Sequence, residues 1–142
     1  MSVISVDLRT IDDKVKFAAV SRENQEIIID YFPPYGEGKG YTSMELLLVS
    51  LGSCLSTTVI TLMRDRMRKS VAGLSLRAIG TTRETHPKAF THIRLEMELT
   101  SPDAGDEDVR KAIAVSEEKL CPVWAMLKGN VEIQTEFRIL RP

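Results

Sequence analysis

Hydrophobic and polar residues alternate along the first part of the chain, which is typical of strands with one buried face. Three such segments follow one another, centred on residues 4–8, 15–19 and 26–32. The turn-like sequences TIDD and SREN separate them. The pattern therefore predicts three antiparallel strands joined by tight turns.

A long uncharged segment follows, from Leu46 to Met63. It comes after the irregular sequence PPYGEGKGY, and Thr42 and Glu45 just before it have the spacing of a capping box. We expect a helix from this point to about Arg68.

The rest of the chain predicts two more strands, a second helix and a last strand. Apolar residues share one face over 74–78, alternate with charged ones over 93–99, recur at helical spacing over 109–120, and alternate again over 131–139. The resulting order, β-β-β-α-β-β-α-β, predicts an α+β fold in which helices cover an antiparallel sheet.

Composition and net charge indicate a globular protein and give no sign of a nucleic-acid-binding or membrane-binding one. A chain of 142 residues that is 43% hydrophobic and 27% charged fits one globular domain, residues 1–142. Its net charge of -1 gives no global attraction to nucleic acid or anionic lipid. The start MSVISVDLRT lacks the basic and apolar blocks of a signal peptide. We therefore expect a cytoplasmic protein without nucleic-acid or membrane partners.

The uncharged segment reaches only the lower length limit of a membrane-spanning helix. Serine, threonine and glycine residues are spread along it, which favours a helix buried within protein. The segment is apolar nearly all round, and a small monomer cannot easily cover such a helix. The prediction is a homodimer in which this helix lies between two sheets.

The chain has two cysteines, Cys54 within LGSCLSTT and Cys121 directly before Pro122. A buried cysteine often packs only as a small hydrophobe. Because proline favours the first position of a helix, Cys121 is expected to be an N-cap, where a thiolate is stabilised and its pKa is lowered. Residue order alone does not predict whether the two thiols meet.

The phrases TSMELLLVSLGSCLSTT and SEEKLCPVWAML resemble the two cysteine motifs of the OsmC/Ohr family, the osmotically inducible and organic hydroperoxide resistance proteins. The resemblance spans almost the whole chain and is greatest to a less characterised branch. It implies an OsmC-like fold, with antiparallel sheets around long central helices in an intertwined homodimer. It also implies a thiol peroxidase in which Cys54 is the peroxidatic cysteine and Cys121 the resolving one. Organic hydroperoxides are then the substrates, an external dithiol the reductant, and no cofactor or metal takes part.

Characterised family members pair the peroxidatic thiolate with an arginine of the second strand. A glutamate near the start of the central helix holds this arginine in place. The matching strand here reads KVKFAAVS and has no arginine, although Lys16 and Arg22 lie nearby in the sequence. Glu45 matches the glutamate by resemblance and is a candidate site residue. Its spacing from Thr42 equally fits the return arm of a capping box.

Other candidates have ordinary interpretations beside the functional ones. The loop PPYGEGKGY is either a lid carrying tyrosines and a lysine or a plain connector. His86 and His92 lack the paired spacing of zinc ligands, and we expect both to be solvated. Trp124 either lines a substrate channel or packs in an interface. The alternative to an enzyme is a dimeric, non-catalytic stress-associated binding protein with vestigial thiols.

Overall fold

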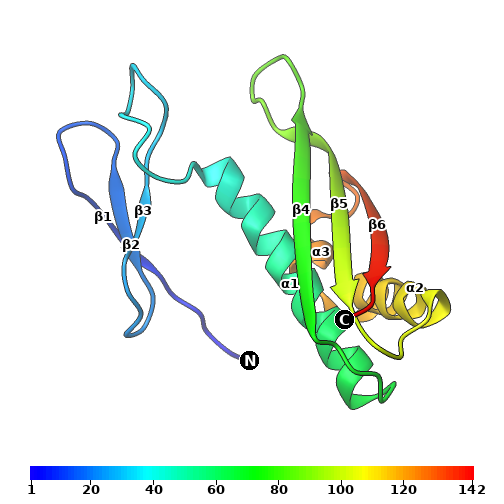
Figure 1. Cartoon of the computed structure of the whole chain (residues 1–142). Helices are drawn as coiled ribbons and strands as arrows, with labels where there is room; N and C mark the ends of the chain where they lie inside the picture. Colours follow the sequence, from blue (N-terminus) through cyan, green and yellow to red (C-terminus); the bar gives the residue numbers. More distant parts are fainter. The chain divides into compact units, whose positions relative to one another are not determined.

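The computed structural model describes residues 1–142 as two compact units, Met1–Leu47 and Leu48–Pro142 (Figure 1). The first unit holds a three-stranded antiparallel sheet of β1 (Asp7–Thr10), β2 (Phe17–Val20) and β3 (Ile27–Ile29). Three strands were expected here, and three are present. The strands are shorter than the alternation predicted. In the first of them, for example, Ile4 and Val6 lie before β1 and are exposed.

The second unit holds a sheet in the order β4 (Gly73–Thr82), β5 (Phe90–Thr100) and β6 (Glu132–Leu140). β4 and β5 are antiparallel, whereas β5 and β6 are parallel. The prediction of a wholly antiparallel sheet was wrong at this last strand. The chain runs from β5 through a helical connection before it returns, and such a crossover leaves the next strand parallel.

The helical connection consists of α2 (Asp106–Val115), a π-helical turn (Ser116–Leu120) and α3 (Pro122–Leu127). In Figure 1 these helices and α1 (Ser43–Asp65) lie on one side of the second sheet. β5 is the centre of that sheet, and its inward side chains are buried: Ile93, Leu95, Met97 and Leu99. Burial of each such side chain contributes about 1.5–3 kcal/mol, so the core of this unit lies between β5 and the helices.

Helix α1 begins and ends close to its predicted limits. It is long and apolar enough to cross a membrane, and only 33% of its most apolar 18-residue window is buried. The hydroxyls of Ser53, Thr57, Thr58 and Thr61 each donate to a carbonyl one turn earlier, at 2.8–3.2 Å. These polar groups are therefore satisfied within the helix, and the uncovered face of α1 is chemically close to apolar.

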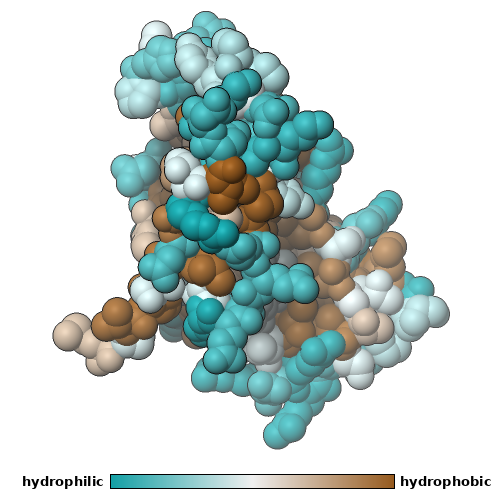
Figure 2. Space-filling view, turned by 90° about the vertical axis from the view of Figure 1, so that its left-hand side faces the viewer, coloured by the Kyte–Doolittle hydropathy of each residue, from teal (hydrophilic) through white to brown (hydrophobic).

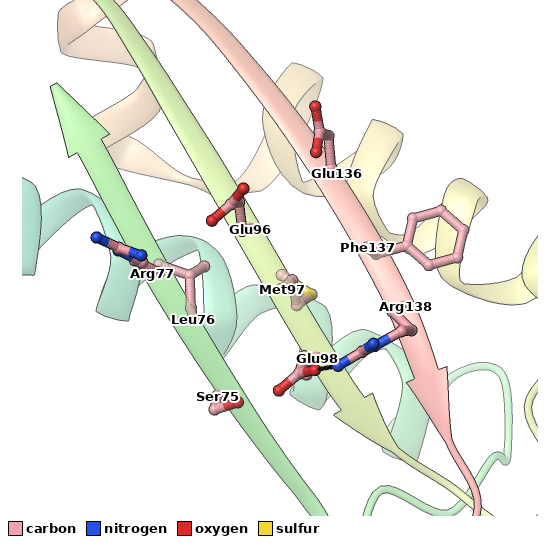
Figure 3. A pocket seen from close by; sticks show the side chains of 9 residues that line it. All are labelled: Ser75, Leu76, Arg77, Glu96, Met97, Glu98, Glu136, Phe137 and Arg138. Atoms are coloured by element: carbon pink, nitrogen blue, oxygen red, sulfur yellow. Dashed lines mark ion pairs between the residues drawn. The ribbon is translucent and has the colours of Figure 1, made fainter. Parts of the chain in front are cut away.

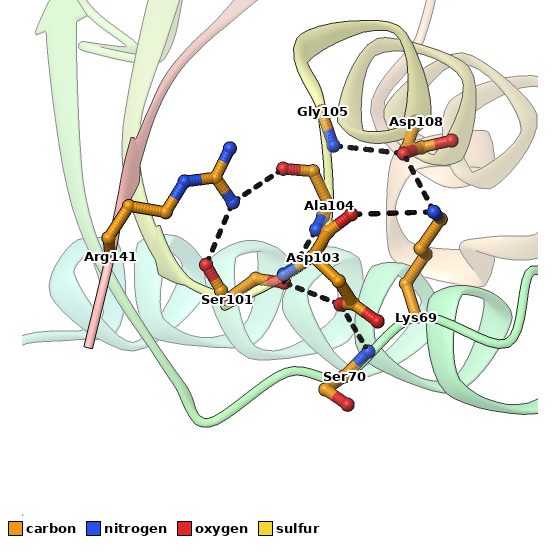
Figure 4. A network of polar contacts seen from close by, with 8 residues as sticks. All are labelled: Lys69, Ser70, Ser101, Asp103, Ala104, Gly105, Asp108 and Arg141. Carbon is orange, nitrogen blue, oxygen red and sulfur yellow. Dashed lines mark hydrogen bonds and ion pairs between the residues drawn. The ribbon is translucent and has the colours of Figure 1, made fainter.

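A network of polar contacts fastens the start of α2 to the rest of the second unit (Figure 4). Ser101 is fully buried, and its hydroxyl accepts from the Ala104 N–H at 3.0 Å. Arg141 donates to the carbonyls of Ser101 and Ala104 at 2.9 and 2.8 Å. Asp103 accepts from the Ser70 N–H at 3.0 Å and thereby joins the segment after α1 to the segment after β5. The Asp103 carboxylate therefore has a structural role in this unit.

Replacement of Ser101 by alanine should lower the free energy of unfolding by about 1–3 kcal/mol, because the buried Ala104 N–H loses its acceptor. Urea unfolding followed by circular dichroism measures the change. Ser75→Ala is the matched control, since Ser75 is exposed on β4. Equal stability of the two variants would show that the Ser101 hydroxyl contributes nothing.

Candidate functional site

Cys54 lies in the middle of α1 as a half-buried free thiol. Its neighbours Leu51 and Leu55 are fully buried and fix the orientation of the helix. Gly52 permits a close approach to β4, because a Cβ at this position would meet Leu76 Cδ2 at 2.9 Å. The helix therefore holds Cys54 on a well-packed element.

Cys121 lies at the junction of the π-helical turn and α3, and only 2% of it is exposed. Its N–H donates to the carbonyl of Ser116 at 2.8 Å and closes the π turn. Its sulfur accepts from the Trp124 N–H at 3.4 Å, which confirms the predicted N-cap. Pro122 occupies the first turn of α3, where a missing N–H costs nothing.

The structure brings the two thiols together. Cys54 is close enough to Cys121 for its hydrogen bonding and its charge to raise the pKa of the Cys121 thiol. Burial raises this pKa further and is the largest cause, so that the pKa reaches about 11. Cys121 therefore keeps its proton at neutral pH, and the half-buried Cys54 is the more exposed of the two thiols.

The expectation that the N-cap position lowers the pKa of Cys121 was wrong. The N–H groups of Trp124 and Val123 do lower it, as expected for a helix N-terminus. Desolvation of the sulfur outweighs them, because a thiolate in an apolar environment loses its hydration. The position of Cys121 was predicted from the following proline, but its burial was not.

Glu45 closes a capping box at the start of α1. Its carboxylate accepts from the Thr42 N–H at 2.8 Å, and the Glu45 N–H donates to the Thr42 hydroxyl at 3.2 Å. Of the two interpretations offered by the sequence, the structure shows the capping role. Both partners belong to the Met1–Leu47 unit.

Lys16, the basic residue directly before β2, is engaged within its own unit. Its ammonium lies 2.6 Å from the Glu37 carboxylate and 4.0 Å from Asp12. The hydrogen bond to Glu37 is the largest cause that raises the pKa of Lys16. Arg22 adopts a left-handed φ of 57° in the turn after β2. The structure thus assigns Lys16 to an ion pair that joins the first hairpin to the loop before α1.

The loop PPYGEGKGY is organised around Asp30, a carboxylate that is 2% exposed. Asp30 accepts from the N–H groups of Tyr31, Glu37 and Lys39 at 2.8, 3.1 and 3.1 Å. These bonds lower its pKa although burial opposes them. A Cβ on Gly36 would meet the Tyr31 carbonyl at 2.3 Å, so the tight loop needs glycine there. The loop therefore has a defined structure, fixed by the Asp30 carboxylate and by Gly36.

The histidines are solvated, as predicted. His92 lies 3.0 Å from Glu132 on the neighbouring strand, and His86 is exposed in the loop after β4. No group of three or more histidine, cysteine, aspartate or glutamate residues in the chain could hold a metal ion.

The outer face of the second sheet carries a shallow hollow of about 610 Å³ between charged side chains (Figure 3). Arg138 of β6 forms an ion pair with Glu98 of the neighbouring strand β5. The Arg94 Nε lies 3.5 Å from the Glu96 carboxylate. The helices cover the opposite face. Neither Cys54 nor Cys121 lines this hollow.

The sequence did not indicate the π turn that precedes Cys121. Within this turn Ser116 is fully buried, and its hydroxyl has no hydrogen-bond partner. Glu117 is half-buried, and burial raises the pKa of its carboxyl. The apolar spacing over 109–120 continues through the turn, so hydrophobic periodicity alone could not separate it from an ordinary helix.

Known proteins resemble the chain in both sequence and fold. Residues 36–136 match the family model described as OsmC-like protein. Protein YhfA of Escherichia coli (strain K12) is 30% identical over 102 residues, which cover 72% of this chain and 75% of that protein. A hypothetical protein from Aquifex aeolicus VF5 superposes with a TM-score of 0.86 at 28% identity, covering 100% of this chain and 99% of that one. The organic hydroperoxide resistance protein OhrB of Bacillus subtilis shares the fold, with a TM-score of 0.67 at 13% identity over 96% and 98% of the two chains.

Ultraviolet titration of thiolates should show Cys121 ionising near pH 11 in the protein. In Cys54→Ser the pKa of Cys121 should fall below about 11, because its neighbour no longer raises it, and should stay above the ordinary value of 9.0, because burial remains. An unchanged Cys121 titration in Cys54→Ser would contradict the proximity of the two sulfurs.

Proposed function

Because the chain belongs to the OsmC-like protein family, we propose that it is a thiol peroxidase that reduces organic hydroperoxides. Cys54 is the peroxidatic cysteine, and Cys121 is the resolving cysteine. The observation that carries the proposal is the pairing of a half-buried thiol with a buried, proton-retaining one. The Bacillus subtilis protein of the same fold is an organic hydroperoxide resistance protein, which supports the substrate class.

The first step is attack of the Cys54 thiolate on the distal oxygen of the hydroperoxide. A sulfur–oxygen bond forms and the O–O bond breaks, so the sulfur is oxidised to a sulfenic acid. The departing alkoxide takes up a proton and leaves as the alcohol. The peroxide is thereby reduced by two electrons, which come from the sulfur of Cys54.

The second step joins the two cysteines. The sulfur of Cys121 attacks the Cys54 sulfenic acid, a disulfide forms, and the hydroxide leaves with the Cys121 proton as water. An external dithiol then restores both thiols by exchange and becomes a disulfide itself. This sequence is balanced by the two sulfur atoms, the hydroperoxide and the dithiol, so we propose no cofactor.

The charge environment of the reaction departs from the family pattern. Lys16, the lysine beside the strand where characterised members carry an arginine, is paired with Glu37. A thiol without a cation nearby ionises less readily. We therefore propose a peroxidase whose first step is slower than in members that retain the arginine.

We propose that the working form is a homodimer assembled on α1. The uncovered face of this helix includes Val49, which is 54% exposed, and the hydroxyls of Thr57 and Thr61 bond to carbonyls of the helix itself. Further large apolar side chains are exposed in the first unit, among them Val3, Ile4 and Ile27. Figure 2 shows such side chains, in brown, open to solvent among hydrophilic ones. Burial of these groups against a second copy would add a hydrophobic driving force.

We also propose a cytoplasmic location, without membrane or nucleic-acid partners. Both cysteines are free thiols, and a reducing compartment keeps such thiols available for a catalytic disulfide. The polar hydroxyls along α1 and the net charge of -1 support the same proposal.

Replacement of each cysteine by serine should reduce peroxidase activity in a different way. Cys54→Ser should abolish consumption of cumene hydroperoxide, because a serine hydroxyl is not a usable nucleophile at neutral pH. Cys121→Ser should retain the first turnover and then lose activity, because its sulfenic acid lacks an internal partner and is oxidised further. Mass spectrometry should find sulfinic or sulfonic acid on Cys54 in that variant and an intramolecular disulfide in the unmodified protein.

Titration of free thiols before and after one equivalent of hydroperoxide tests the alternative function. Rapid loss of both thiols with cumene hydroperoxide, and a slower loss with hydrogen peroxide, agrees with the proposed enzyme. Unchanged thiols would contradict the proposed peroxidase and favour the non-catalytic binding protein. Full activity in both serine variants would overturn the assigned roles.

Light scattering at micromolar concentration should give the mass of a dimer. Val49→Asp should shift the mass toward the monomer, because a carboxylate would be buried without a partner in the proposed interface. Ser75→Asp on the outer sheet face should leave the mass unchanged. A monomeric unmodified protein would contradict the dimer.

A further inference from the structure

The thiol of Cys121 has two roles that compete for the same sulfur. It caps α3 by accepting the Trp124 N–H at 3.4 Å. In the proposed reaction, on which this inference rests, the same sulfur forms a disulfide with Cys54. A disulfide holds its two sulfurs about 2.05 Å apart within a narrow range of dihedral angles, so the position of the Cys121 sulfur would then depend on Cys54 as well as on the Trp124 N–H.

Helix α3 depends strongly on its cap. It is only six residues long, and none of its residues is buried. Isolated helices of this length are unstable, and the side chains of Val123, Trp124 and Leu127 are only half-buried, so the cap makes a substantial contribution to α3. At its start, Pro122 presets the backbone and Cys121 supplies the acceptor for Trp124.

The segment before α3 has two energetically unfavourable features, a rare backbone conformation and a buried hydroxyl without a hydrogen-bond partner. The turn of Ser116–Leu120 is π-helical, a rare conformation that is frequent at functional sites. It closes on Cys121 itself through the bond to the Ser116 carbonyl, and it buries the Ser116 hydroxyl without a partner. A segment with such local costs is held in place by its surroundings, of which the contacts of Cys121 are a part.

We propose that α3 is a redox-responsive element: formation of the Cys54–Cys121 disulfide withdraws the cap from the Trp124 N–H and loosens α3. In this step Cys121 loses its S–H, the Cys54 sulfenic acid loses its hydroxyl, and water leaves. The reduced and oxidised forms then differ in the exposure of apolar side chains next to Cys121 in the sequence, among them Leu120 and Met126, which are 41% and 70% exposed in this structure.

Hydrogen exchange of the full chain tests the proposal, with the Trp124 amide as the probe. Oxidation by cumene hydroperoxide should make this amide exchange about fivefold faster, the effect expected for loss of one helix cap. Emission from Trp124, the only tryptophan, should change in parallel. Reduction by dithiothreitol should restore both values.

Two variants separate the cap from the packing of Cys121. Cys121→Ala removes the acceptor, so reduced protein should already show fast exchange at Trp124. Cys121→Ser restores an acceptor at the N-cap, so exchange should stay slow and should not respond to the oxidant. Cys54→Ser, which cannot form the disulfide, should keep the slow exchange after oxidation.

Diamide, which oxidises neighbouring thiols directly, keeps the test independent of peroxidase activity. A disulfide formed by diamide with faster exchange at Trp124 supports the inference even if hydroperoxide leaves the thiols unchanged, a result that would reject the proposed function alone. A complete disulfide with unchanged exchange and emission would overturn the inference. Failure of every oxidant to join the two cysteines would overturn both.

Discussion

The burial of one sulfur atom is the constraint on which the site depends. Cys121 occupies a helix N-terminus, where backbone N–H groups favour a thiolate, yet its surroundings remove water from it. The loss of hydration is the stronger effect and raises the pKa of Cys121 to about 11. Two identical side chains therefore lie in different environments, since Cys121 is buried and keeps its proton whereas Cys54 is half-buried.

The same balance between polar groups and burial operates along α1. Serine and threonine hydroxyls bond to carbonyls of their own helix, so they add no unsatisfied group to a surface that is to be covered. The helix can therefore carry Cys54 in an apolar setting without a charged residue over its central turns. The proposed dimer, the proposed location and the proposed chemistry all draw on this property.

Much of the fold followed from local patterns. The capping box of Thr42 and Glu45, the long helix after it, and the alternation in β5 were predicted from spacing alone and are present. Features that depend on residues distant in the sequence were not predicted from local patterns. The Asp30 carboxylate organises its loop through backbone groups seven and nine residues away, and no motif marks that arrangement. The direction of β6 depended on a crossover whose length the sequence shows but whose path it does not.

The sequence by itself determined the two cysteine motifs, the helix that bears Cys54 and the proline that places Cys121 at the start of α3, because all of these depend on neighbouring residues. Only the tertiary structure decided that the two thiols meet, that a π turn precedes Cys121, and that its pKa is raised rather than lowered. The physical reason is that desolvation and proximity are set by residues brought together from α1, the π turn and α3. A helix N-terminus is a local property, whereas the water that a sulfur loses is a property of the whole packed unit.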